Sequence, residues 1–355
     1  MSRFFSTKYS SLTPYTPGEQ PTGRAYIKLN TNESPYPPAP LVTKMAAEAA
    51  ENLQLYPDPT CADLVARAAE QLGLAKEELL FTNGSDEILH FAFMAFCDAE
   101  HPAVFPDITY GFYRVFAELN GVPFRELPLK EDFTVDTAAF SPANGTVFLA
   151  NPNAPTGIPL SRAEVEGIIA ANPDNVVVVD EAYVDFGGES VLPLIKKYDN
   201  LLVCRTFSKS RSLAGARLGF GAACPALIRD LNAIKYSTNP YNINRMTMAA
   251  GIGSLSDEWY FKKTLQMVTA ERERAAEGLV KLGFTCLPSK ANFLFIRHPS
   301  LDGKQLYLAL KEKGVLVRHF DTPRLRDYNR VSIGSREQMN GFFAALTAIL
   351  EENRV

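Results

Sequence analysis

The sequence predicts an α/β protein with a large domain, in which helices flank a mostly parallel central sheet, and a smaller C-terminal α/β domain. Short apolar runs alternate with amphipathic helical patterns from about residue 41. The pattern changes after about residue 245, where a long helical stretch precedes short strands. The length of 355 residues suits about two domains of roughly 150 residues. We expect an arm over 1–40, a large domain over 41–250 and a small domain over 251–355.

The first 40 residues are rich in Pro, Tyr, Asn and Thr, which is typical of an extended arm. Helices are expected at 41–53 and 61–72. A third helix is expected at 84–96, because its apolar residues recur at three- and four-residue spacing. They are Ile88, Leu89, Ala92, Phe93 and Phe96.

Five apolar runs follow, and such runs are typical of parallel strands buried on both faces. They are AVF at 103–105, TVFLA at 146–150, VVVVD at 176–180, LLVC at 201–204 and LGFGA at 218–222. Between the second and third, Ser161 and Glu164 form a capping-box pattern that begins a helix reaching about Ala171, before Pro173. This order of strand, helix and strand predicts right-handed crossovers and a parallel sheet.

The C-terminal part is expected to form the smaller unit. A helix near 256–282 precedes strands at 293–297, 315–318 and 330–334. The last helix is predicted from apolar residues at helical spacing. They are Met339, Phe342, Phe343, Leu346, Ile349 and Leu350.

Composition argues against several classes of protein. The net charge is −4 and there is no Lys/Arg block, so neither nucleic acid nor an anionic membrane is expected as a partner. No apolar stretch approaches 18 residues, and the N-terminus lacks the apolar core of a secretion signal. Five scattered cysteines without a C-x-x-C pair predict free thiols, no metal site and a cytoplasmic location.

Polar segments follow four of the expected strands, where ligands of open parallel sheets bind. They are TNGSDE (82–87), NPNAPTG (151–157), DEAYVDF (180–186) and RTFSKSRSLAGAR (205–217). Taken singly, a Gly-Ser-Asp sequence is usually a helix cap, an Asn-Pro-Gly sequence a turn, and a lone lysine a solvated surface charge. All four lie at one rim if the strands are correctly placed, and this joint pattern favours a ligand site.

The groups at this rim match one kind of ligand. Asp180 offers a fixed negative charge and Lys209 an amine. Anion-binding groups would come from the helix start at Gly84 and Ser85 and from two flanking side chains, Ser208 and Arg217. A phosphorylated aldehyde with a basic ring nitrogen would use every one of them, and pyridoxal 5′-phosphate fits that description.

The chain also resembles the fold-type I pyridoxal-phosphate-dependent aminotransferases, most closely those acting on histidinol phosphate. The resemblance runs nearly end to end and its strength lies in the ordered set of motifs. They are LTPY (12–15), LNTNESPY (29–36), YPD (56–58), NGSDE (83–87), TYGFY (109–113), NPNAPTG, VVVVDEAYVDF, RTFSKSRSLAGARLGF, ANFLF (291–295) and RVSIG (330–334) with Arg336 close behind.

The resemblance implies roles for individual residues. Lys209 would bind the cofactor covalently and act as the base, Asp180 would pair with the ring nitrogen, and Tyr183 would donate to the ring's phenolic oxygen. Tyr110 would stack on the ring. The phosphate would be held by Gly84, Ser85, Ser208 and Arg217, with Asp86 also expected at the cofactor.

Two further positions bear on the cofactor. Tyr56 would reach the phosphate in a neighbouring subunit, so the resemblance implies a homodimer with shared active sites. Many relatives have Asn immediately before Pro-Thr-Gly, whereas this chain has Ala154. Asn153 is a candidate to take over the contact with the phenolic oxygen, although a one-residue offset changes its direction.

The implied activity is transfer of the amino group of L-histidinol phosphate to 2-oxoglutarate, giving imidazole acetol phosphate and glutamate in histidine biosynthesis. Substrate contacts are expected from Tyr15, Asn292, Arg318 and Arg330. An aromatic amino-acid aminotransferase and a phosphothreonine-type decarboxylase stay open as alternatives, since both use the same lysine and aspartate. A non-catalytic descendant would lack one of those residues, and a dehydrogenase would need a G-x-G-x-x-G sequence after an early strand.

Overall fold

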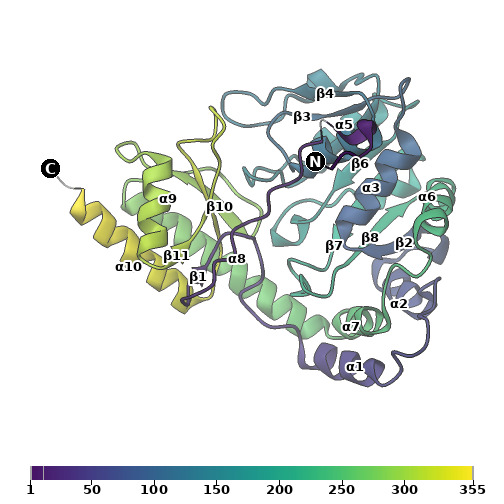
Figure 1. Cartoon of the computed structure of the whole chain (residues 1–355), viewed down its shortest axis with the longest axis horizontal. Coiled ribbons are helices and arrows are strands. Elements are labelled where there is room, and N and C mark those ends of the chain that lie inside the picture. Colours follow the sequence, from purple (N-terminus) through teal and green to yellow (C-terminus); the bar gives the residue numbers. More distant parts are fainter. Residues whose placement is uncertain (1, 11, 354–355) are drawn as a thin grey trace.

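The computed structural model describes residues 2–10 and 12–353, so the outermost ends of the expected arm and small domain, residues 1 and 355, lie outside the described residues. A seven-stranded sheet forms one part of the molecule, and a four-stranded sheet with its helices forms the other (Figure 1). The seven-stranded sheet has the order β2-β8-β7-β6-β5-β3-β4. Its strands are β2 (Leu79–Asn83), β3 (Ala103–Pro106), β4 (Phe124–Leu127), β5 (Thr146–Ala150), β6 (Val177–Asp180), β7 (Leu201–Thr206) and β8 (Leu218–Ala223).

The sheet is parallel apart from one strand. Strand β8 is antiparallel to both of its neighbours, β7 and β2, so the prediction of a parallel strand at 218–222 was wrong. Strand β2 was expected only as the strand that precedes TNGSDE, and no residue range was predicted for it. Only the loop 207–217 separates β7 from β8, and parallel neighbours would need a longer crossover. Because two reversals cancel, β2 runs in the same direction as β7, β6 and β5. The polar segments therefore follow strand ends at one edge, as predicted.

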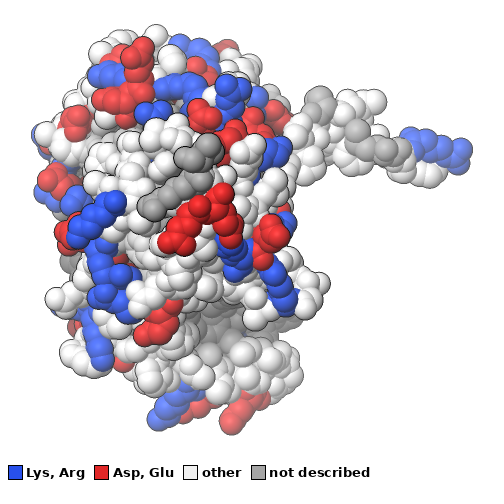
Figure 2. All heavy atoms as spheres, turned by 90° about the vertical axis from the view of Figure 1, so that its left-hand side faces the viewer, with Lys and Arg blue, Asp and Glu red and all other residues white. Residues whose placement is uncertain are grey.

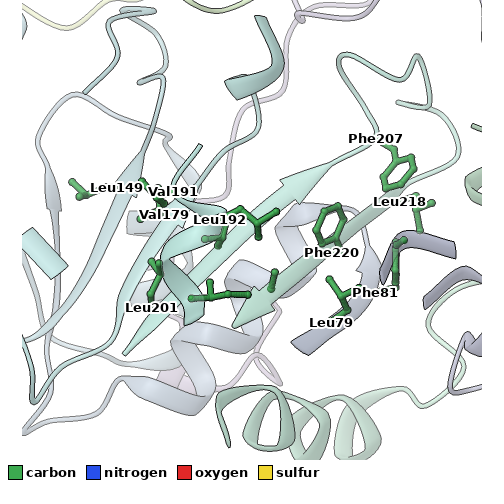
Figure 3. Close-up of a cluster of buried hydrophobic side chains, with 14 of the residues drawn as sticks. Leu79, Phe81, Leu149, Val179, Val191, Leu192, Leu201, Phe207, Leu218 and Phe220 are labelled. Carbon is green, nitrogen blue, oxygen red and sulfur yellow. The ribbon is translucent and has the colours of Figure 1, made fainter. Parts of the chain in front are cut away.

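Alternate residues of the central strands enter two separate cores, which is why these strands are apolar throughout. Val177 and Val179 pack on one face, whereas Val178 packs on the other. Figure 3 shows part of the first core, including Val179, Leu149 and Phe220. The first face is covered by α2 (Ala62–Leu72), α5 (Arg162–Ala170) and α7 (Arg245–Ser256), and the second by α3 (Ser85–Phe96), α4 (Phe112–Asn120) and α6 (Pro225–Thr238).

Several local predictions are confirmed. Helix α3 begins at Ser85 after Gly84, and α1 (Pro40–Ala50) and α2 lie close to their expected ranges. Ser161 and Glu164 form the capping box at the start of α5. Short 3₁₀ helices occur at η1 (Thr7–Tyr9), η2 (Lys76–Glu78), η3 (Thr137–Phe140), η4 (Val184–Phe186) and η5 (Leu192–Lys196).

The C-terminal part packs helices on an antiparallel sheet of order β12-β13-β10-β9. Its elements are α8 (Glu258–Lys281), β9 (Thr285–Cys286), β10 (Phe293–Arg297), α9 (Gly303–Glu312), β12 (Arg318–His319), β13 (Asn329–Ser332) and α10 (Arg336–Glu352). The strand expected at 315–318 is divided: β11 (Val315–Leu316) pairs with β1 (Ile27–Lys28) of the arm, whereas β12 pairs with β13. Strands β1 and β11 form a separate two-stranded sheet, which anchors the arm to the C-terminal part.

Within the described residues, no helix is long and apolar enough to cross a membrane. Figure 2 shows basic and acidic side chains interspersed over the face in view, without a large patch of one sign. Mixed charge of this kind is typical of an ordinary solvated surface.

Candidate active site

A cavity of about 260 Å³ lies at the carboxyl edge of the seven-stranded sheet. The residues around it come from all four polar segments that follow β2, β5, β6 and β7, and from the arm. They are Thr31, Glu33, Ser85, Asp86, Tyr110, Ala150, Ala154, Asp180, Ala182, Tyr183, Thr206, Ser208, Lys209, Ala214 and Arg217. Eight predicted site residues are therefore brought together here, although their roles remain predictions.

One end of the cavity can hold an anion. Gly84 caps α3 with φ +79°, and a Cβ there would lie 2.5 Å from the Arg217 guanidinium. A Cβ on Gly219 would lie 2.5 Å from the Ser85 amide nitrogen. The glycine at 84 lets the Arg217 guanidinium lie against the start of α3, and the glycine at 219 lets β8 lie close to the Ser85 amide. Such a pocket suits a phosphate group.

The carboxylate of Asp86 organises the same end of the cavity. It accepts hydrogen bonds from the phenol of Tyr110 at 2.6 Å and from Arg217 at 3.0 Å. The Tyr110 side chain is thereby fixed at the cavity wall, where the prediction has it stacking on a flat ring. Ser208 lies nearby, with its hydroxyl accepting from Thr206 at 3.0 Å.

Asp180 lies at the end of β6 and is only 5% exposed. Its carboxylate accepts hydrogen bonds from the Ala182 amide at 3.1 Å and from the buried phenol of Tyr113 at 3.3 Å. Burial, together with the nearby acids Asp86 and Glu181, raises the pKa of Asp180 to about 7, although the hydrogen bonds from Ala182 and Tyr113 oppose the shift. Among the described residues it forms no ion pair, so this carboxylate lacks the cation that would keep it charged.

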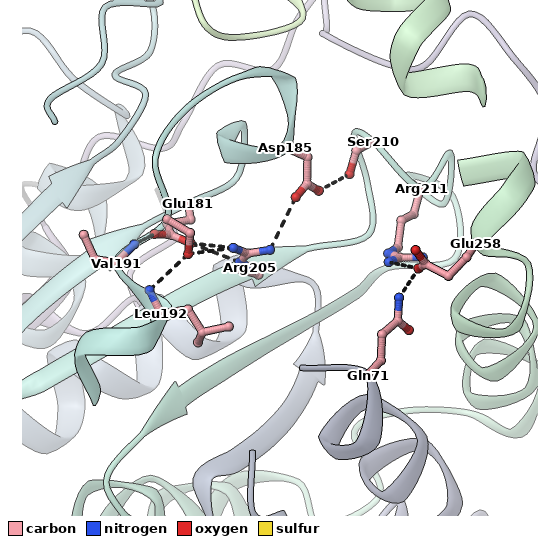
Figure 4. Close-up of polar contacts among 10 residues, drawn as sticks. Gln71, Glu181, Asp185, Val191, Leu192, Arg205, Ser210, Arg211 and Glu258 are labelled. Carbon is pink, nitrogen blue, oxygen red and sulfur yellow. Dashed lines mark hydrogen bonds and ion pairs between the residues drawn. The ribbon is translucent and has the colours of Figure 1, made fainter. Parts of the chain in front are cut away.

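The neighbouring acid Glu181 is 2% exposed but fully partnered. It accepts from Arg205 at 3.0 Å, from the Ser190 hydroxyl at 2.8 Å and from the Val191 amide at 2.6 Å. Figure 4 shows how Arg205 continues to Asp185, which accepts from Ser210 at 2.5 Å. This chain of contacts fixes the start of the loop that carries Lys209.

Lys209 extends from that loop into the cavity. Its amine donates to the carbonyl oxygen of Thr31 at 3.3 Å and lies 5.9 Å from the centre of the Tyr183 ring. The hydroxyl oxygen of Tyr183 in turn accepts from the side-chain amide of Asn32 at 2.9 Å. The amine and the phenol therefore face the same space as Asp180.

Asn153 is not brought to the cavity wall, contrary to what its candidate role requires. Its amide oxygen accepts from Thr109 at 2.8 Å, and its amide nitrogen donates to the Ile108 carbonyl at 3.0 Å and contacts Thr156 at 3.2 Å. The one-residue offset turns the side chain into the loop. Ala154 lines the cavity in its place and offers no polar group.

The predicted substrate residues lie beyond the cavity, towards the arm and the small sheet. Arg330 donates to the Asn30 carbonyl at 3.1 Å, and its Nε is buried without a hydrogen-bond partner. Arg318 donates to the carbonyl oxygens of Thr16 and Pro17 in the arm. Desolvation lowers the pKa of Arg330, so an anion arriving beside this guanidinium would be bound strongly.

The other two predicted substrate residues differ in exposure and in hydrogen bonding. Tyr15 stacks on Phe112 with ring centres 4.3 Å apart, and 40% of it is exposed. Asn292 is buried and donates to the Asn32 carbonyl at 3.0 Å, leaving its own oxygen without a partner. Tyr56 lies outside the cavity: it is 76% exposed and stacks on Tyr241.

Sequence reasoning missed four residues of this region. Thr31 and Glu33 line the cavity, Asn32 holds Tyr183, and Tyr113 holds Asp180. All four fall inside the motifs LNTNESPY and TYGFY. The motifs therefore pointed to these residues, but Asn32 and Tyr113 contact residues 151 and 67 positions away in the sequence, which no motif reveals.

The donor set fits one small organic ligand better than a metal. No group of three His, Cys, Asp or Glu side chains suited to a metal occurs in the described part of the chain. The site instead offers a phosphate pocket, an amine and a buried acid without a cation. A ligand with a phosphate, a carbonyl carbon and a basic ring nitrogen would complete all three, as pyridoxal 5′-phosphate does.

Comparison with known proteins agrees with this geometry. The family model described as "Aminotransferase class I and II" matches residues 24–346. The chain is 48% identical over 353 residues to histidinol-phosphate aminotransferase of Brachyspira hyodysenteriae, covering 99% of this chain and 100% of that protein. The Acinetobacter baumannii (strain AYE) enzyme of that name is 47% identical over 340 residues, covering 95% and 94%. The crystal structure of histidinol-phosphate aminotransferase from Sinorhizobium meliloti in complex with pyridoxal-5′-phosphate gives a TM-score of 0.90 at 26% identity, covering 100% of this chain and 99% of that one.

Proposed function

Because this chain belongs to the aminotransferase class I and II family, we propose that its cavity is where the amino group of L-histidinol phosphate passes to 2-oxoglutarate. The chain is a pyridoxal-phosphate-dependent aminotransferase that acts on histidinol phosphate, like relatives 47% and 48% identical to it over nearly its whole length. The choice of 2-oxoglutarate as acceptor and a cytoplasmic setting are part of the proposal.

One observation carries the assignment of the site. A buried acid without a cation, Asp180, and the amine of Lys209 line one cavity whose far end is an anion pocket. Pyridoxal phosphate would be held there by the Ser85 amide, Ser208 and Arg217 at its phosphate, with Asp180 at the ring nitrogen. When bound, it supplies an electron-accepting ring for the carbon that loses a proton.

The chain's own groups have separate tasks in this reaction. Asp180 would hold a proton at the ring nitrogen, because a cationic partner stabilises the charged form of a buried carboxylate. The amine of Lys209 would take the proton from the amino-bearing carbon of the substrate. Its contact with the Thr31 carbonyl keeps the amine at the cavity wall. Tyr110 and Tyr183 line the cavity and would restrict the movement of a bound ring.

Arg330 supports the choice of substrate. Its partly unpaired guanidinium, on the small sheet, can form a bidentate contact with phosphate or with carboxylate. Histidinol phosphate and a keto acid must occupy the site in turn, and one arginine that accepts either anion serves both. Arg318 can join it only by leaving the arm carbonyls of Thr16 and Pro17.

We further propose a homodimer. Tyr56 does not line the cavity and stacks on Tyr241, and Leu53 and Leu55, close to it in sequence, are also exposed. Exposed apolar side chains that lie together favour coverage by a second copy. The measurement is the mass in solution by light scattering; a monomer at working concentration would contradict this part.

The activity is tested by steady-state rates of the loaded protein with three amino donors. Histidinol phosphate should give the highest kcat/KM of the three, because it is the donor after which relatives 48% and 47% identical to this chain are named. Release of carbon dioxide from phosphothreonine, or a preference for phenylalanine, would contradict the substrate assignment while leaving the cofactor site intact.

A further inference from the structure

The wall of the cavity next to Tyr183 lacks a direct polar contact that the sequence led us to expect. Ala154 packs against Ala291, Phe293 and Tyr183 and has no side-chain donor. Asn153 uses both ends of its amide within its own loop. Any tuning of a ligand oxygen at this wall must therefore come through the phenol of Tyr183.

That phenol has one partner from the arm. The side-chain nitrogen of Asn32 donates to the Tyr183 oxygen at 2.9 Å, across 151 residues of sequence. Asn32 is 1% exposed and has φ +56°, a left-handed conformation that few residues other than Gly, Asn and Asp tolerate. Asn32 lies outside every helix and strand, so this backbone conformation belongs to the loop itself.

Every polar group of Asn32 is used. Its backbone amide donates to the Ser332 hydroxyl at 2.8 Å, and that hydroxyl donates to the Asn32 side-chain oxygen at 2.9 Å. Its carbonyl accepts from Asn292 at 3.0 Å. Because the side-chain oxygen is occupied by Ser332, the amide nitrogen is the end presented to Tyr183.

This direction has a consequence for the phenol. An oxygen that accepts from Asn32 keeps its own proton available for another acceptor. We propose that Asn32 is a positioning residue: by donating to Tyr183 it directs the tyrosine proton into the cavity, towards the ring oxygen of the cofactor. In this chain, which has Ala154 at the wall, the pair of Asn32 and Tyr183 then supplies the hydrogen bond to that oxygen.

The inference rests on the proposed cofactor site, and it is tested by spectroscopy. Pyridoxal phosphate is bound to the purified protein and the pH midpoint of its visible absorbance band is measured. A donated hydrogen bond stabilises the anionic ring oxygen, so losing it should raise that midpoint. Asn32→Asp keeps the shape and the left-handed backbone but offers Tyr183 an acceptor, which would draw the proton away from the cavity. The midpoint should rise by about one pH unit, equivalent to one charge-assisted hydrogen bond.

Further variants make the result decisive. Asn32→Gly removes the amide without adding charge, tolerates the same backbone, and should raise the midpoint by a smaller amount. Asn329→Asp makes the same change at another buried asparagine, whose amide donates to the Gly303 carbonyl, and should leave the midpoint unchanged. In a Tyr183→Phe background, Asn32→Asp and Asn32→Gly should have little further effect, because the phenol through which they act is gone.

Failure of the inference can be distinguished from failure of the proposed function. An unchanged midpoint in both Asn32 variants overturns the inference, and so does a shift of equal size in the Tyr183→Phe background, which would indicate a through-space charge effect. If the unmodified protein develops no visible band with the cofactor, the proposed function itself fails, whatever the Asn32 variants do.

Discussion

Asp180 and Glu181 are adjacent in the chain and both are buried, yet their surroundings differ. Glu181 is held by Arg205, Ser190 and the Val191 amide (Figure 4). Asp180 accepts hydrogen bonds from the phenol of Tyr113 on α4 and from the Ala182 amide, and neither donor is charged. Burial raises the pKa of both acids. Glu181 thus has a cationic partner within the protein, whereas Asp180 has none among the described residues.

The difference indicates what each acid is for. A buried charge that carries its own counter-charge and hydrogen bonds maintains the structure. A buried acid without a cation costs stability, and such positions are common at functional sites. The comparison predicts that substitution at 180 affects catalysis, whereas substitution at 181 affects folding.

The largest effect should come from Asp180→Asn. An amide of the same shape cannot hold a proton at the ring nitrogen, so kcat should fall about 10³-fold, roughly 4 kcal/mol. The protein should still fold and still bind the cofactor. Single-turnover kinetics measure the loss. Near-normal turnover of Asp180→Asn would contradict a role for Asp180 in catalysis.

Glu181→Ala should mainly destabilise the fold. It leaves Arg205 buried with one carboxylate fewer, and the free energy of unfolding should fall by about 3 kcal/mol. This is the lower limit for breaking a buried ion pair, because Asp185 and Ser190 still contact the guanidinium. Urea unfolding of the cofactor-free protein measures it. Replacing both partners, as in Glu181→Gln with Arg205→Met, should recover much of the loss.

The pH dependence of stability gives a third test. In the cofactor-free protein the pKa of Asp180 is about 7, above its ordinary 3.8, so between these values the folded state binds more protons than the unfolded state. Its contribution to stability is therefore greatest below about pH 4 and is lost as pH rises to about 7, by up to about 1.4 kcal/mol per pH unit. The difference between the wild-type and Asp180→Asn unfolding curves isolates this group. A difference that is flat over pH 4–7 would contradict the pKa shift.

The smallest effect should come from Tyr113→Phe. Losing the hydrogen bond from the phenol should destabilise the Asp180 carboxylate by about 1 kcal/mol and raise its pKa further. The pH window just described should move upwards by less than one unit. The other ionisable groups around this carboxylate, Asp86, Glu181 and Cys204, are unchanged in the variant. A shift downwards would mean that the phenol does not donate to Asp180.

The sequence predicted the rim of this site for a definite physical reason. Parallel strands place their carboxyl ends at one edge, so the segments after β2, β5, β6 and β7 could be assigned to one place without coordinates. The direction of β8 was missed because an apolar run buried on both faces looks the same in either direction. The support residues were missed because Tyr113 precedes Asp180 by 67 residues and Asn32 precedes Tyr183 by 151, and no local periodicity encodes such contacts.

The central claim is that Lys209 and Asp180 hold one cofactor ring between them. Its most direct test is the visible spectrum of the purified protein loaded with pyridoxal phosphate, before and after histidinol phosphate is added. The wild-type protein should show a band above the range of ordinary protein absorbance, and the substrate should bleach it. Lys209→Ala should bind the cofactor without that band and show no turnover. A Lys209→Ala protein with a wild-type spectrum and normal activity would contradict the account.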